Sequence, residues 1–273
     1  MNKINFVFFG TPDVASETLE ILKQNNYLPS LIVTSPDAKK GRGLQLQTSP
    51  TAVFAEQNNI HCLKPEKFDE NFVDQLSAIN YNLFVVVAYG KIIPEKILNI
   101  PKFGSINIHY SLLPKYRGAS PVESAILNGE TETGVTIQKM QYKLDAGDIL
   151  TVEKINIELD ETAPELRTRL INLGGNLLVK ILPDITSGKI KKVKQNEEEA
   201  TYSKKIKKED GLIDLDDNPI KNYNKFRAYA AWPRTFFFKN GKRIIITQAH
   251  LENGAFIIDK IISEGGKEME YKN

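Results

Sequence analysis

The chain has 273 residues, 41% hydrophobic and 26% charged, which is the composition of an ordinary folded protein with one large domain or two unequal ones at roughly 150 residues per domain. Lys and Arg number 36 against 34 Asp and Glu, so the formal net charge of +2 excludes a global basic excess, and any nucleic-acid-binding patch must be local. The single cysteine, Cys62, excludes an internal disulfide, and no run of about 18 apolar residues exists to span a bilayer. Together with the lack of an apolar signal stretch at the N-terminus, this predicts a cytoplasmic protein with no membrane partner.

The first part of the chain alternates short apolar runs with helix-periodic segments. Strands are predicted at residues 4–9, 31–33, 60–63, 83–88 and 105–109. Helices are predicted at residues 15–22, 52–55, 68–79 and 121–127, and a long polar loop lies between residues 33 and 52. The run at 83–88 is apolar without interruption, which is typical of a strand buried on both faces. The pattern therefore predicts an α/β fold with a Rossmann-like, mostly parallel sheet covered by helices.

The remainder of the chain changes character twice. Two antiparallel strands, 135–140 and 148–154, flank the turn-rich residues 145–147, and a helix follows from 164 to about 182. A lysine-rich stretch without apolar periodicity indicates a linker. Short strands with a hairpin signal at 239–242 then predict a small β module. The predicted boundaries are 1–186 for the first domain, 187–208 for the linker and 209–273 for the β module.

Several common cofactor motifs are missing. The turn at residues 10–13 lies where a dinucleotide-binding fold places three glycines, but it has one glycine, and Pro12 removes a backbone donor. Pro12 at the start of a helix is equally well explained by plain helix capping. The phosphate-binding sequence G-x-x-x-x-G-K-[ST] does not occur, and the Cys and His residues lack the spacing of zinc ligands. We therefore expect no nicotinamide, ATP or metal cofactor.

Asn107 and His109 are the first candidate catalytic residues. Two positions apart on a strand, they share one face near its carboxyl end, where ligands gather in open α/β sheets. An amide donor and an imidazole together can hold a carbonyl oxygen as it becomes an oxyanion, and the imidazole can also transfer a proton. The alternative is a strand whose polar face is simply hydrogen-bonded.

Asp145 is the second candidate. It lies in a turn, where Asp often bonds its own backbone, and that is the structural explanation. A carboxylate beside His109 would instead orient the ring and stabilise its charged form. Spacing in the sequence does not show whether the two residues meet.

An ordered set of motifs resembles the 10-formyltetrahydrofolate-dependent formyltransferases. The motifs are residues 10–13, 107–109, 111–118, 132–136 and 144–148. Later segments, 200–211 and 227–233, resemble the tRNA-formylating branch of that family. The resemblance covers nearly the whole chain. It implies transfer of a formyl group from 10-formyltetrahydrofolate, the co-substrate, to the α-amine of methionine on initiator tRNA, for translation initiation.

The resemblance also assigns residues by position. Asn107, His109 and Asp145 match the catalytic trio of the family. Residues 88–90 match its segment beside the pterin pocket. Its folate-contacting segment corresponds to Ser111, Leu112, Leu113 and Pro114.

Residues 39–43 match the family insertion that reaches the acceptor end of the tRNA. Two lysines and an arginine among glycines suit contacts to phosphates and base edges, and within the loop Arg42 is favoured above Lys40. Without the resemblance, a solvated charged loop would explain the same residues. We expect a monomer whose partners are initiator methionyl-tRNA and the folate co-substrate.

The C-terminal module is shorter than the oligonucleotide-binding (OB) barrel that the resemblance implies, with a hairpin missing between residues 248 and 257. We expect an abbreviated OB-like barrel. Two other functions stay open at this point. A sugar-nucleotide N-formyltransferase shares the folate domain, and a folate- or tRNA-binding protein without turnover would need none of the catalytic trio.

Overall fold

The computed structural model describes residues 4–40 and 44–272. The chain forms two compact units, each made of separate stretches. The first comprises residues 1–114, 135–153 and 170–199, and the second comprises residues 115–134, 154–169 and 200–273. The first unit therefore continues past residue 186, and the boundaries given above stay predictions.

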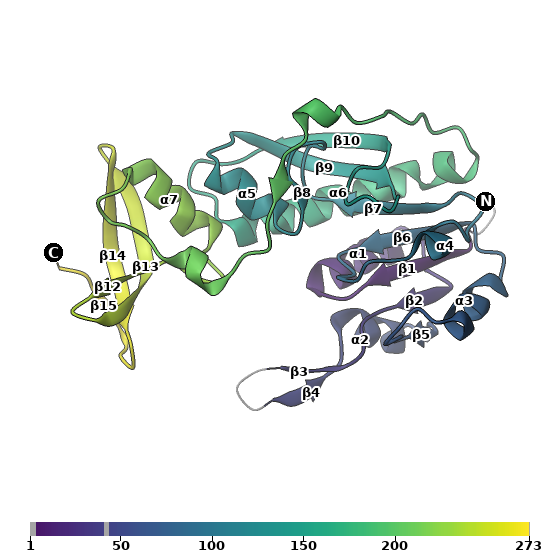
Figure 1. The fold of residues 1–273 in the computed structure, drawn as a ribbon, viewed down its shortest axis with the longest axis horizontal. Coiled ribbons are helices and arrows are strands. Elements are labelled where there is room, and N and C mark those ends of the chain that lie inside the picture. Colours follow the sequence, from purple (N-terminus) through teal and green to yellow (C-terminus); the bar gives the residue numbers. More distant parts are fainter. Residues whose placement is uncertain (1–3, 41–43, 273) are drawn as a thin grey trace. The chain divides into compact units, whose positions relative to one another are not determined.

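A central sheet organises the first unit (Figure 1). Its strands are β1 (Phe6–Gly10), β2 (Leu31–Val33), β5 (Cys62–Leu63), β6 (Leu83–Val87), β7 (Ser105–His109), β9 (Glu132–Lys139) and β10 (Ile149–Asn156). They lie in the order β10-β9-β7-β6-β1-β2-β5, parallel from β5 to β7, with β9 antiparallel to β7. All five residues of β1 and of β6 are buried, as their unbroken apolar sequence predicts. The mostly parallel sheet is confirmed.

The predicted helices are also present. They are α1 (Asp13–Gln24), α2 (Pro50–Gln57), α3 (Glu70–Ser77) and α6 (Ala163–Thr186), with one further short helix, α4 (Glu95–Leu98). Along α1 the buried residues Ala15, Leu19 and Leu22 recur at helical spacing and form the face toward the core. Ser49 caps α2, because its hydroxyl accepts a hydrogen bond from the backbone N–H of Ala52.

The polar stretch between residues 33 and 52 was predicted to be a loop, and part of it is not. Strands β3 (Ala38–Lys40) and β4 (Gln45–Gln47) pair antiparallel, with Lys39 opposite Leu46. The prediction relied on apolar alternation. Two short exposed strands can pair through main-chain hydrogen bonds without it.

Outside its C-terminal sheet, the second unit contains helices and short strands. These are β8 (Arg117–Gly118), α5 (Pro121–Leu127), the 3-10 turn η2 (Lys208–Gly211), β11 (Tyr202–Ser203) and α7 (Pro219–Ala228). Another 3-10 turn, η1 (Glu197–Glu199), belongs to the first unit. The helix α5 was predicted and α7 was not. The start of α7 carries a strong capping signal, since Asn218 accepts from two backbone N–H groups and Pro219 follows at the first helical position.

The C-terminal module is a four-stranded antiparallel sheet. Its strands, β12 (Phe236–Lys239), β13 (Lys242–Glu252), β14 (Ala255–Ser263) and β15 (Glu268–Glu270), pair in sequence order, so that β12 and β15 form the two edges. The predicted turn at 239–242 is confirmed: Asn240 and Gly241 have φ of 52° and 73°, which suits a tight hairpin. A small β module at the C-terminus is therefore confirmed.

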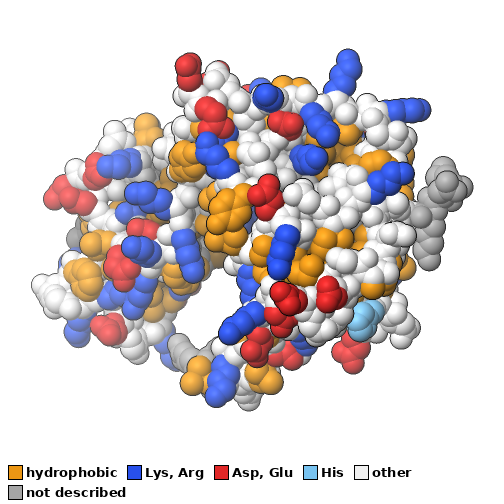
Figure 2. Space-filling view, turned by 45° about the vertical axis from the view of Figure 1, so that its right-hand side comes forward, with side chains coloured by type: hydrophobic (Ala, Val, Ile, Leu, Met, Phe, Trp, Pro, Cys, Tyr) orange, Lys and Arg blue, Asp and Glu red, His pale blue; other side chains and the backbone are white. Residues whose placement is uncertain are grey.

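The surface carries no single sign of charge. Figure 2 shows basic and acidic side chains interspersed over the face it displays, in keeping with a formal net charge of +2. Across residues 4–40 and 44–272, no helix has both the length and the apolar composition needed to cross a membrane.

Candidate active site

Asn107 and His109 lie on β7, in the middle of the sheet, and face the same side of it. Across the antiparallel pair, Asn107 is opposite Gln138 and His109 is opposite Thr136. His109 is buried and Asn107 half-buried. Within the described part of the chain, the Asn107 amide has no hydrogen-bond partner, so its N–H groups remain available to a ligand.

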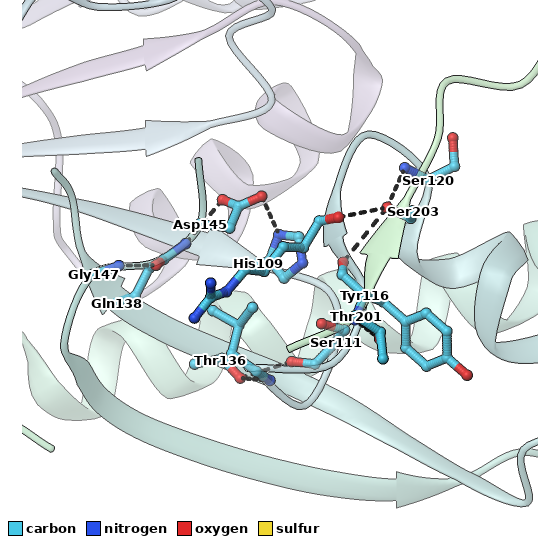
Figure 3. A network of polar contacts seen from close by, with 12 residues as sticks. His109, Ser111, Tyr116, Ser120, Thr136, Gln138, Asp145, Gly147, Thr201 and Ser203 are labelled. Carbon is cyan, nitrogen blue, oxygen red and sulfur yellow. Dashed lines mark hydrogen bonds and ion pairs between the residues drawn. The ribbon is translucent and has the colours of Figure 1, made fainter. Parts of the chain in front are cut away.

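Asp145 meets His109, as Figure 3 shows. The Asp145 carboxylate oxygen Oδ2 lies 3.6 Å from Nδ1 of His109, and the two side chains are 12% and 6% exposed. Asp145 comes from the loop between β9 and β10, so this loop folds back along β9 to reach the imidazole. The structure therefore brings together two of the residues that sequence spacing could not connect.

Two glutamines that the sequence reading did not select complete this cluster. Gln138, on β9, donates from Nε2 to Oδ1 of Asp145 at 2.9 Å. Gln195, in the segment after α6, donates to the backbone oxygen of Asp145 at 2.9 Å. The register of β9 offered a signal for Gln138, because it lies directly opposite Asn107, whereas nothing in the sequence near Gln195 marks it.

Residues 111–114 follow β7 directly and are anchored to β9. The hydroxyl of Thr136 donates to the backbone oxygen of Ser111 at 2.7 Å and accepts from the backbone N–H of Leu113 at 3.1 Å. Ser111 and Leu113 are buried, and Leu112 and Pro114 are half-buried. The predicted folate-contacting segment therefore begins at the end of the strand that carries His109.

Residues 88–90 follow the neighbouring strand, β6. Ala88 is exposed and has a left-handed backbone with φ of 45°, while Tyr89 is buried. Burial raises the pKa of the Tyr89 phenol to about 12, so it stays neutral at physiological pH. The hydroxyl of Thr11, after β1, donates to the backbone oxygen of Tyr89 at 3.2 Å. Three loops at the carboxyl ends of parallel strands thus lie at one edge of the sheet, where ligands bind in open α/β folds.

The residues predicted to bind tRNA are placed only in part. Lys40 ends β3, opposite Gln45, and Lys39 beside it is exposed. Arg42 lies outside the described residues. In the second unit, four exposed lysines, called here the linker lysines, are Lys204, Lys205, Lys207 and Lys208.

Metal ligands were not expected from the sequence. Among the residues that the structure describes, no group of three or more His, Cys, Asp or Glu side chains is placed to hold a metal ion.

Comparison with known proteins identifies the family. Residues 2–182 match the family model described as formyl transferase, and residues 205–267 match that of its C-terminal domain. The methionyl-tRNA formyltransferase of Caldanaerobacter subterraneus is 42% identical over 250 residues, which cover 91% of this chain and 81% of that protein. That of Dictyoglomus turgidum is 41% identical over 270 residues, covering 97% of this chain and 85% of that protein.

Solved structures show the same fold at lower identity. A methionyl-tRNA formyltransferase from Clostridium thermocellum superimposes with a TM-score of 0.63 and 19% identity, covering 98% of this chain and 100% of that one. A 4-N formyltransferase from Francisella tularensis gives a TM-score of 0.70 at 23% identity, covering 92% and 100%. The family model and the relatives above 40% identity carry the assignment: this chain belongs to the methionyl-tRNA formyltransferases of the formyl transferase family.

Proposed function

We propose that this protein transfers the formyl group of 10-formyltetrahydrofolate to the α-amine of methionine on initiator tRNA. The observation that carries the proposal is the contact between His109 and Asp145, together with the amide of Asn107, which has no hydrogen-bond partner among the described residues. These groups are the donors and the acid–base pair that acyl transfer to an amine requires. The high identity to methionyl-tRNA formyltransferases over most of the chain supports the choice of acceptor.

The chemistry assigns a task to each member of the trio. The neutral amine attacks the formyl carbon, and the bond from carbon to the new nitrogen forms as the carbonyl oxygen becomes negative. Asn107 and His109 donate hydrogen bonds to that oxygen. The bond from carbon to the folate nitrogen then breaks, the proton lost by the amine passes to the leaving nitrogen, and Asp145 holds His109 for this transfer.

The two substrates would use different parts of the chain. Ser111, Leu112, Leu113 and Pro114, with residues 88–90, would hold the folate, because they border the trio at the sheet edge. Lys40 and Arg42 would contact the acceptor end of the tRNA. The linker lysines would attract the tRNA backbone. We further propose that the enzyme acts as a monomer in the cytoplasm.

Two other functions are less well supported. Sugar N-formyltransferases are similar to this chain in fold, at 22% and 18% identity for two solved structures, whereas the methionyl-tRNA formyltransferases of Caldanaerobacter subterraneus and Dictyoglomus turgidum are 42% and 41% identical. A binding protein without turnover would have no need for a carboxylate directed at a buried imidazole.

One assay tests the proposal. The purified protein is given a labelled formyl donor together with either charged initiator tRNA or an amino-sugar nucleotide. We expect label in the methionyl-tRNA and none in the sugar. Label in the sugar alone would mean that the acceptor is an amino sugar. Label in neither acceptor would contradict the proposed formyl transfer.

A further inference from the structure

The loop that carries Asp145 has an unusual backbone conformation. Asp145 has φ of 46°, in the left-handed region, although it is not a glycine. Such a conformation is uncommon for residues with a Cβ, although Asp adopts it more readily than most, and neighbouring contacts help to determine it. The contacts around the loop should therefore show what holds the carboxylate in place.

Gln195 supplies one set of these contacts. Its Nε2 donates to the backbone oxygens of Asp145, at 2.9 Å, and of Gly147, at 2.7 Å. The same nitrogen lies 3.5 Å from Oε1 of Gln138, so Gln195 also contacts the other glutamine. The segment that carries Gln195 is held by an antiparallel β-bridge, in which the backbones of Val193 and Ile149 exchange two hydrogen bonds of 2.8 and 2.9 Å.

Gln138 supplies the second set, visible in Figure 3. Its Oε1 accepts from the backbone N–H of Gly147 at 3.2 Å, and its Nε2 donates to Oδ1 of Asp145 at 2.9 Å. The orientation of this carboxamide is fixed by chemistry, because the opposite one would face oxygen to carboxylate and NH₂ to N–H. Gln138 is 2% exposed, so water does not replace either bond at low cost.

The two oxygens of the Asp145 carboxylate therefore have different neighbours. Oδ1 is held by Gln138 and Oδ2 faces His109. Gly147 lets the loop fit closely against β9, since a Cβ there would lie 1.6 Å from the backbone oxygen of Lys139. Gln195 thus holds the backbone of the loop, and Gln138 holds both its backbone, at Gly147, and the side chain of Asp145.

We propose that Gln138 and Gln195 are positioning residues that hold the Asp145 carboxylate against His109. This inference rests on the proposed function, in which Asp145 acts through His109. Both glutamines are assigned this role through their contacts with the Asp145 loop. Losing either one would let the carboxylate move, and a misplacement of about 1 Å can lower turnover about 100-fold.

The test uses the full-length protein and the formyl-transfer assay. We expect Gln195→Met, which keeps the shape and removes both donors, to lower kcat about 10- to 100-fold. KM for both substrates and the thermal unfolding temperature should stay close to those of the parent. Gln195→Glu should have a lower kcat than Gln195→Met, because it places a carboxylate against two carbonyl oxygens. If Gln195→Met turns over like the parent, the proposal is wrong.

Gln141→Met is the matched control. Gln141 donates to the backbone oxygen of Ala146 at 2.7 Å in the same loop, and among the described residues it makes no hydrogen bond to Asp145 or Gly147. We expect its kcat to stay near the parent value. An equal loss in Gln141→Met and Gln195→Met would mean that the loop is merely stabilised as a whole, which contradicts positioning at Asp145.

A variant of the other glutamine tests the ionisation of the Asp145 carboxylate directly. Gln138→Glu keeps the acceptor for Gly147 and places a second carboxylate beside Oδ1 of Asp145, where the two acids would share a proton. The fall of kcat at acidic pH should then begin at a higher pH than in the parent. A purely structural role would leave that pH unchanged. Asp145→Asn, measured in parallel, distinguishes failure of the proposed function from failure of the positioning role. If Asp145→Asn turns over normally, the proposed function fails. If Asp145→Asn is inactive and both glutamine variants turn over normally, only the positioning role fails.

Discussion

Thr136→Val should separate the folate segment from the strand beside it. The hydroxyl of Thr136, which is fully buried, bonds the backbone at both Ser111 and Leu113. Valine has the same shape, so the substitution removes these two bonds without opening a cavity. It leaves the Leu113 N–H buried without its acceptor.

The cost follows from those two bonds. An unsatisfied buried N–H costs about 1–3 kcal/mol, and the lost bond to the Ser111 oxygen adds about 1 kcal/mol. We therefore expect a loss of about 2–4 kcal/mol in the free energy of unfolding. Because residues 111–114 lose their anchor, KM for the formyl donor should rise while KM for charged tRNA stays near the parent value.

Urea unfolding and steady-state kinetics measure both effects. With a denaturant slope of about 2–3 kcal/mol per molar, the urea midpoint should fall by about 1 M. Thr136→Ser keeps the hydroxyl and serves as the control, with both bonds retained. A valine variant as stable as the serine variant, with an unchanged KM for the donor, would refute the reasoning.

Three further predictions concern the trio and the tRNA. Asn107→Ala should lower kcat about 100- to 1,000-fold with little change in folate affinity, because an oxyanion donor acts mainly in the transition state; turnover near that of the parent would remove Asn107 from the mechanism. Arg42→Ala should raise KM for charged tRNA and leave KM for the formyl donor unchanged, and equal damage to both values would contradict a role confined to tRNA. Neutralising all four linker lysines should flatten the dependence of log affinity on log salt, by filter binding, with turnover at saturating tRNA retained; an unchanged slope would mean that they do not touch tRNA.

Local sequence patterns were enough to predict much of the fold. The apolar runs of β1 and β6 specify strands buried on both faces, and Asn240-Gly241 specifies a hairpin, because in each case the signal lies within a few neighbouring residues. The helix α7 was missed although Asn218 and Pro219 mark its start. The hairpin of β3 and β4 was missed because its pairing depends on main-chain bonds rather than on apolar alternation.

The candidate site was predictable only as separate pieces. Asn107 and His109 share a strand face, which alternation alone predicts. The approach of Asp145 to His109 depends on a loop folding back over β9, and that path is set by long-range contacts. Gln195 lies 50 residues beyond Asp145 along the chain, so no local pattern could connect the two.

The contact between Gln195 and the Asp145 loop bears on where the catalytic part of this protein can be cut. A fragment ending with α6 at Thr186 would contain Asn107, His109 and Asp145, yet it would lack both the Val193 bridge and the Gln195 carboxamide. Domain exchange with a relative, or the design of a minimal formyltransferase, should therefore retain the chain through Glu199, where the first unit ends. The stretch after α6 is thus more than a spacer between two modules, because its first half supplies contacts that hold the loop carrying Asp145.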